Sequence, residues 1–190
     1  MTMTPRERFM TALDRKPLTG RVPHFELLFF LTMEAFGRVH PSQRRYAQWD
    51  QMEEKERQLH RKDYADLHIQ IAERFEHSAI MLTVPHGREE TLRFIDLVRE
   101  QSGDKYFLLL SADATYSIPS GENMVEFSMR LADEPEKIKE EAKNRVDQAL
   151  ERAEQLAQHG GLDGFTMCAD YCLNTGPFLS PSQFSEFVAP

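Results

Sequence analysis

The stretch that decides the fold runs from residue 162 to residue 190 and reads LDGFTMCADYCLNTGPFLSPSQFSEFVAP. Its apolar run from Phe165 to Ala169 follows a glycine-rich break and predicts a buried strand. Asp170 comes where this strand should end, and a polar loop follows it. The pattern Ser180-Pro181-Ser182-Gln183 is a capping box, with proline at the first helical position, and predicts the start of a helix. The order is therefore strand, acidic residue, loop and capped helix.

Predicted strands and helices alternate along the rest of the chain. Strands are predicted over residues 22–28, 78–84, 106–110 and 165–169. Helices are predicted over residues 5–15 (after a capping box at Thr4-Pro-Arg-Glu7), 28–36, 51–74, 89–101 and 121–131, and from a cap at Asp133 to Gly160, with an irregular connection over 41–49. This alternation is typical of βαβ units and predicts an α/β fold with a parallel sheet. Residues at the carboxyl ends of such strands line the ligand site.

Composition narrows the function classes. The 190 residues suit a single domain over 1–190, with enough length to bury a core. The net charge of −8 argues against nucleic-acid and membrane surfaces as partners, because both attract basic proteins. The longest apolar run, residues 27–31, is far shorter than the roughly 20 residues that span a bilayer. With two cysteines and no visible signal peptide, a cytoplasmic location is expected.

Motifs at both ends of the chain resemble signatures of the uroporphyrinogen decarboxylase superfamily. The carboxyl-terminal motif consists of Asp170, Gly176-Pro177 and Leu179-Ser-Pro-x-x-Phe184-x-x-Phe187-Val-x-Pro190. The amino-terminal motif consists of Met3-Thr-Pro-Arg-Glu-Arg-Phe9, Asp14-Arg-Lys-Pro and Arg21-Val-Pro23. The superfamily includes decarboxylases of haem biosynthesis, and methyltransferases that work with corrinoid proteins, coenzyme M or folate-type acceptors.

The resemblance implies a TIM barrel. Eight βα units and typically about 250 residues make such a barrel, whereas four strands are predicted here. The chain is therefore expected to form about half of a (β/α)8 barrel, the amino-terminal half, preceded by a helical extension. An open half-barrel exposes strand edges, so either a further part of the protein or a second chain, as in a homodimer, should cover them.

Asp170 is the candidate catalytic residue. A carboxylate at the carboxyl end of a strand can hold substrate N–H groups or a cationic centre. It can also cap the following turn through a side-chain hydrogen bond. The resemblance favours the functional interpretation.

Two departures from the decarboxylases concern their substrate ligands. The resemblance implies that their second strand ends in an aspartate that holds pyrrole N–H groups, whereas the matching segment here ends in Thr83. They also carry an Arg-Gln-Ala-Gly-Arg motif soon after the first strand, which residues 24–31 lack. A neutral hydroxyl cannot balance the charge of a protonated pyrrole, and a polycarboxylate without its arginines loses charge-assisted bonds. Thr83 is therefore expected to bind a different substrate.

Three further residues are candidates for substrate binding. Glu26 near the end of the first predicted strand needs a partner or a ligand if it is buried, so an ion pair and a functional role are both open. Asp113 follows the third strand and could instead cap a turn, and Tyr116 matches a pocket tyrosine of the decarboxylases. His24 shares a strand face with Glu26, but a structural histidine is favoured over a metal ligand. His86 could face the pocket or solvent.

No metal site is assigned in this segment. Cys168 and Cys172 do not have zinc-knuckle spacing. The resemblance implies that methyltransferases of the superfamily bind zinc through His-x-Cys and a distant Cys, and His-x-Cys does not occur here. Zinc and a corrinoid are therefore expected only in a full-length parent, whose partners would be a small-molecule substrate or a corrinoid protein.

These observations favour a corrinoid-linked methyltransferase-like enzyme over a haem-pathway decarboxylase. The decarboxylase, acting on tetrapyrrole carboxylates, is one alternative. A non-catalytic half-barrel that serves as a binding or assembly module is another. If the chain is a fragment of a longer enzyme, the fragment alone is expected to be inactive.

Overall fold

The computed structural model describes residues 3–27, 30–39 (only the backbone of residue 30), 48–84, 87–114, 116, 119, 121 and 123–189. The contacts divide the chain into two compact units. Unit 1 comprises Met1–Leu110 and His159–Phe165, and unit 2 comprises Ser111–Gln158 and Thr166–Pro190. A single domain over residues 1–190 therefore stays a prediction.

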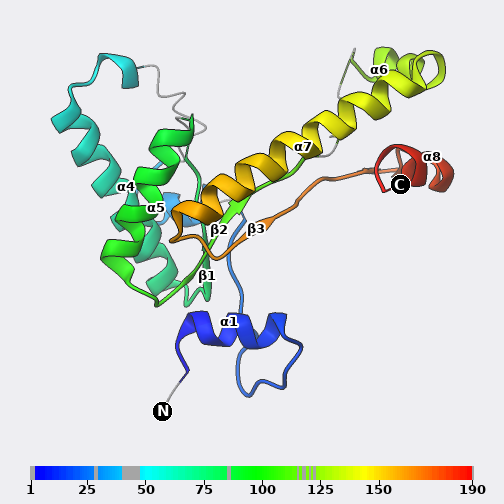
Figure 1. Cartoon of the computed structure of the whole chain (residues 1–190). Helices are drawn as coiled ribbons and strands as arrows, with labels where there is room; N and C mark the ends of the chain where they lie inside the picture. The colour runs from blue at the N-terminus through cyan, green and yellow to red at the C-terminus, as the bar shows by residue number, and fades with distance from the viewer. Residues whose placement is uncertain are drawn as a thin grey trace. The chain divides into compact units, whose positions relative to one another are not determined.

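Helices alternate with strands along the chain (Figure 1). In chain order the elements are α1 (Pro5–Leu13), α2 (Phe30–Glu34), the 3₁₀ helix η1 (Trp49–Gln51), α4 (Glu54–Arg74), β1 (Ala79–Met81), α5 (Gly87–Ser102), β2 (Phe107–Ser111), α6 (Asn123–Asp133), α7 (Pro135–His159), β3 (Gly164–Thr166), β4 (Cys172–Leu173), β5 (Gly176–Pro177) and α8 (Pro181–Phe187). Most of the predicted connection at 41–49 lies outside the described residues.

A three-stranded parallel sheet has the order β1-β2-β3. β1 pairs with β2 in parallel, with Ala79 opposite Phe107. Between β2 and β3, the N–H of Asp163 donates to the carbonyl of Leu108 and that of Ala112 donates to Thr166, both at 3.0 Å. The two pairs keep nearly the same sequence offset, as parallel strands require. The predicted α/β arrangement of strands and helices is thus confirmed.

The prediction of a first strand over residues 22–28 is wrong. Within the described residues 22–27 no strand forms, and one backbone bond, from the N–H of Ser78 to the carbonyl of His24 at 2.8 Å, joins this segment to the start of β1. Pro23 has no N–H to donate to a ladder, which weakens strand pairing here. The apolar pattern therefore marks a connection that packs beside the sheet.

The last predicted strand forms, but it is shorter and less buried than expected. β3 covers Gly164–Thr166, and the side chains of Phe165 and Met167 are 37% and 79% exposed. β3 stands at one end of the strand order and has one neighbour, β2. Central β2, by contrast, buries its residues from Phe107 to Leu110. An edge position alone does not explain this exposure, because β1 stands at the other end of the order and is buried against α1 and α4.

Both predicted capping boxes are confirmed. The hydroxyl of Thr4 accepts from the N–H of Glu7 at 3.1 Å, and the carboxylate of Glu7 accepts from the N–H of Thr4 at 2.7 Å. The same reciprocal pair joins Ser180 and Gln183 at the start of α8, at 3.3 and 3.0 Å. These bonds satisfy N–H groups that have no partner inside the helix.

The core of unit 1 lies between its helices and the sheet. Helices α4 and α5 pack against each other, and α4 also contacts β1. Fully buried side chains come from α4 (Ala65, Ile71), α5 (Ile95, Val98) and the strands (Ile80, Leu108). The near-continuous burial of β1 and β2 is typical of parallel strands.

Unit 2 has its own small core. Buried Tyr116, Leu131, Ile138, Leu179 and Phe187 form one cluster that joins α6, α7 and α8. β4 and β5 form a two-residue antiparallel pair where the sequence predicted only a loop, with Cys172 opposite Pro177. In the described part of the chain, no helix is both long and apolar enough to cross a membrane.

A cluster around Asp163 connects the elements of unit 1. The Asp163 carboxylate is 10% exposed and accepts hydrogen bonds from Arg6 at 2.6 Å, from Arg99 at 2.7 Å and from the N–H of Leu108 at 2.9 Å. Burial by itself would raise the pKa of Asp163, but the hydrogen bonds from Arg6, Leu108 and Arg99 outweigh it and lower this pKa. The carboxylate therefore holds α1, α5 and β2 together.

Asp163→Asn should destabilise the protein by about 2–4 kcal/mol, because two arginines lose a largely buried partner. Urea unfolding followed by circular dichroism would measure the loss. Asp104→Asn is the matched control: Asp104 lies 3.8 Å from the same Arg99, but its side chain is 88% exposed. The control should change the free energy of unfolding by less than about 0.5 kcal/mol. Equal losses in the two variants would contradict the role given to Asp163.

Candidate functional site

The carboxyl ends of β1, β2 and β3 lie at the same edge of the sheet, because the strands are parallel. Thr83, Asp113 and Asp170 each follow one of these ends within a few residues. Glu26 and Thr83 belong to unit 1, whereas Asp113 and Asp170 belong to unit 2. The gathering of all four side chains at one rim therefore stays a prediction.

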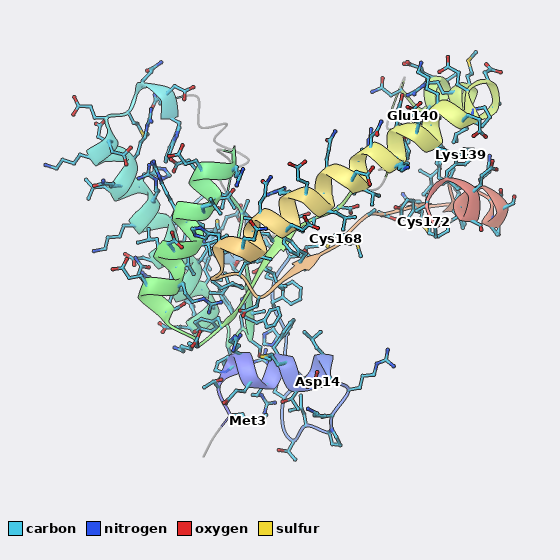
Figure 2. The ribbon with its side chains drawn as sticks, in the orientation of Figure 1. Met3, Asp14, Lys139, Glu140, Cys168 and Cys172 are labelled. Carbon is cyan, nitrogen blue, oxygen red and sulfur yellow. The ribbon has the colours of Figure 1, made fainter. Side chains whose placement is uncertain are left out.

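Asp170 makes the turn-capping bond that the sequence left as the alternative. Its Oδ1 accepts from the N–H of Cys172 at 2.9 Å, and the residue is exposed. Within the described residues, Oδ2 has no hydrogen-bond partner, so one carboxylate oxygen remains for a ligand. Figure 2 shows Cys168 and Cys172 on the segment that leads from β3 to α8. Both are exposed free cysteines.

Asp113 connects two strand ends within unit 2. Its Oδ2 accepts from the N–H of Cys168 at 3.0 Å. The bond continues the pairing in which the N–H of Ala112 donates to Thr166. Asp113 therefore caps the neighbouring strand, while its roles as a turn cap and as a substrate ligand stay predictions.

Tyr116 has the contacts of a core residue. Its buried hydroxyl donates to the carbonyl of Ile138 at 2.9 Å, and the guanidinium of Arg145 lies 4.3 Å from the centre of its ring. Burial and the nearby Glu141 carboxylate raise the pKa of Tyr116, so the phenol stays protonated. Its role as a substrate ligand remains a prediction beside this structural role.

Glu26 and Thr83 differ in their surroundings. The Glu26 carboxylate accepts from the hydroxyl of Thr32 at 2.6 Å, so its partner is a neutral hydroxyl from α2 and not a cation. Thr83 is half-buried just beyond β1. His24 bonds the carbonyl of Phe75 at 3.1 Å and approaches Arg21 at 3.2 Å, which agrees with a structural histidine. His86 lies outside the described residues.

Sequence reasoning missed a pocket in unit 1. The pocket has a volume of about 480 Å³ and lies at the amino ends of β1 and β2, opposite the carboxyl edge of the sheet. Its lining comes from the α1 region, the connection after it, the end of α4 and the starts of the two strands: Met3, Pro5, Arg8, Arg21, Val22, His24, Ala72, Glu73, Glu76, His77, Ser78, Lys105 and Tyr106. The charged and histidine residues immediately before the two strands were a signal in the sequence that could have indicated this pocket.

His77 is buried in the wall of this pocket. Burial lowers the pKa of His77 from the ordinary 6.5 to about 4, helped by the nearby charges of His24 and Arg21. The rings of His24 and His77 meet edge to face with centroids 5.3 Å apart. At neutral pH the imidazole of His77 is therefore uncharged.

His77 should make the fold sensitive to acid. Between pH 6.5 and about 4 the unfolded chain binds a proton that the folded chain excludes, so stability falls as the pH is lowered through this range. At about 1.4 kcal/mol per pKa unit, the loss is at most about 3.5 kcal/mol. His77→Gln should flatten this part of the profile, measured by urea unfolding at several pH values. A His77→Gln profile as steep as the wild type would refute the assignment.

Tyr116→Phe should cost about 1 kcal/mol, because the carbonyl of Ile138 loses its buried donor. Tyr171→Phe is a matched control in the same unit. The buried Tyr171 hydroxyl has no hydrogen-bond partner among the described residues, so its removal should be neutral or slightly stabilising. Thermal unfolding would compare the two variants. If Tyr171→Phe proved the more costly change, the structural role of the Tyr116 hydroxyl would be wrong.

No protein-family model, curated protein or solved structure matches the chain. Among the described residues, no group of three or more His, Cys, Asp or Glu side chains could hold a metal ion. Any function proposed for this chain must therefore be argued from its motifs and from the geometry of the residues described above.

Proposed function

We propose that the chain is part of an enzyme of the uroporphyrinogen decarboxylase superfamily, closer to its corrinoid-linked methyltransferases than to the haem-pathway decarboxylases. The observation that carries this proposal is the motif from Asp170 to the end of the chain. Its predicted order is present in the structure: β3, then Asp170, the β4–β5 turn, and α8 with its capping box. The parallel sheet alternating with helices is compatible with a partial α/β fold, and we propose that this fold is part of a (β/α)8 barrel.

Asp170 is the residue to which we assign the main role. Its Oδ1 caps the turn, which fixes the side chain, while Oδ2 can accept from a substrate N–H or pair with a developing positive charge. A carboxylate held in one orientation binds such a group at a lower entropic cost than a freely rotating one. Thr83 and Asp113, which also follow strand ends, would line the same site, with Glu26 and Tyr116 as further candidate ligands.

The choice of methyl transfer over decarboxylation follows from two departures from the decarboxylases. Thr83 stands where the decarboxylases place an aspartate, and residues 24–31 lack their arginine motif. The residues present do not fit a zinc site either, since the chain has no His-x-Cys and its described part has no metal-ligand cluster. No catalytic step is therefore assigned to a metal held by this chain. Both cysteines are free, which fits a reducing compartment such as the cytoplasm.

A non-catalytic assembly module is the second candidate function. The observation in its favour is the edge strand β3, whose side chains are partly exposed where a barrel would continue with another strand. A further segment of the protein, or a second copy of the chain, would pair with this edge.

Asp170→Asn separates the functional role of the carboxylate from its structural role. Asparagine can still accept from the N–H of Cys172, so the melting temperature should change little. Activity should fall by at least about tenfold, since one charged hydrogen bond to the transition state contributes about 1.5–3 kcal/mol. The measurement is methyl transfer from a methylated corrinoid to a thiol or folate acceptor by the product of the complete reading frame.

The same preparation should form no coproporphyrinogen from uroporphyrinogen. Coproporphyrinogen formation with no methyl transfer would establish the decarboxylase alternative. Absence of both activities, with a dimer or larger complex in light scattering, would favour the assembly module. Asp104→Asn, which removes an exposed carboxylate outside both motifs, is the control and should leave the activity unchanged.

A further inference from the structure

We propose that the pocket at the amino ends of β1 and β2 binds a small organic monocarboxylate with an apolar body. This site lies wholly within unit 1, and it does not depend on the proposed function, which concerns the opposite edge of the sheet. Its volume of about 480 Å³ falls within the range of about 300–1,000 Å³ that is usual for small-molecule sites.

The pocket lining combines apolar side chains with polar ones. Ala72 and Tyr106 are almost fully buried, and the aliphatic side chains of Met3, Pro5 and Val22 also line the pocket. Buried His77 is uncharged at neutral pH, so it adds no charge to this surface. An apolar ligand body would cover the accessible side chains of Met3, Pro5 and Val22 and gain about 25 cal/mol for each Å² of them removed from water, whereas Ala72 and Tyr106 have almost no accessible surface left to cover.

Of the cationic side chains that line the pocket, one has no acidic partner among the described residues. Arg21 pairs with Glu76 at 2.6 Å, and Lys105 pairs with Glu73 at 2.8 Å. The guanidinium of Arg8 instead donates to the carbonyl of Thr19 at 3.2 Å and to that of Arg21. Within the described residues, Arg8 has no carboxylate partner. The lining therefore has an excess of one positive charge, which suits a monoanion.

Arg8 has the chemistry that a carboxylate requires. A guanidinium has five N–H donors, and the two bonds to backbone carbonyls leave others for a ligand. These two bonds also hold the side chain in place, so it loses little freedom when it binds. Charge-assisted bonds between arginine and a carboxylate are stronger than bonds between neutral groups. The ligand's carboxylate would thus lie at Arg8 and its apolar body against Met3, Pro5 and Val22.

Benzoate is the test ligand, and benzamide is its neutral control of the same shape. Titration of the complete chain, followed by two-dimensional NMR of backbone amides, should show saturable shifts for residues that line the pocket. Benzoate should bind at least about tenfold more tightly than benzamide, since a charge-assisted bond is worth about 1.5–3 kcal/mol. Inorganic phosphate, an anion without an apolar body, should bind more weakly than benzoate.

Three variants of the pocket test the charge assignment. Arg8→Gln should weaken benzoate binding about tenfold, and Arg8→Lys should weaken it less because the charge is kept. Glu73→Gln releases Lys105 from its ion pair, so benzoate should bind several-fold more tightly. A loss of folding cannot produce this gain, which keeps the test decisive even if Arg8→Gln destabilises the protein. Arg88→Gln, an exposed position on α5, should leave the affinity unchanged.

Three results would overturn the proposal. The first is the absence of saturable shifts in the pocket at about 10 mM benzoate, a concentration that detects even millimolar binding. The second is equal affinity for benzoate and benzamide, because Arg8 would then have no role. The third is shifts that map to residues outside the lining, or that persist unchanged in both Arg8→Gln and Glu73→Gln.

Discussion

The pairing of Asp163 with Arg6 and Arg99 is the constraint on which unit 1 depends. A carboxylate with 10% exposure would be costly without partners, and here α1, α5 and the backbone of β2 each supply one. The turn before Asp163 is also constrained by its contacts with α5. Gly161 has a φ of +79°, and a Cβ there would lie 2.9 Å from the side chain of Ile95. Arg99 also donates to the carbonyl of Gly161, so one arginine holds both the turn and the carboxylate.

Aspartates in this chain repeatedly bind backbone N–H groups at the ends of strands. Asp163 accepts from Leu108, Asp113 from Cys168, and Asp170 from Cys172. Short parallel strands leave N–H groups unpaired at their ends, and a nearby carboxylate satisfies them. At Asp170 a structural role and a functional role are compatible, because within the described residues the cap uses one of its two carboxylate oxygens.

The two edges of the sheet differ in chemistry. The carboxyl edge is followed by Thr83, Asp113 and Asp170, which are neutral or acidic. The amino edge is preceded by His77 and Lys105, and the lining of the pocket there includes Arg8 and Arg21. The lining also includes Glu73 and Glu76, so its excess is one positive charge in a chain whose net charge is −8. Long-range attraction of anions to the whole protein is weak, so selectivity at the amino edge would come from close contacts with the pocket.

Local features were determined by the sequence alone. The caps at Thr4 and Ser180 and the alternation of strands with helices were predicted correctly, because capping bonds and apolar periodicity act over a few residues. Only the tertiary structure decided which side chains are buried and what they bind. The exposure of Phe165, the loss of the first predicted strand and the partner of Asp113 depend on segments far apart in the chain. The Asp163 cluster joins residues 6, 99, 108 and 163, and no local pattern encodes such an encounter, since desolvation and ion pairing arise only when these segments meet.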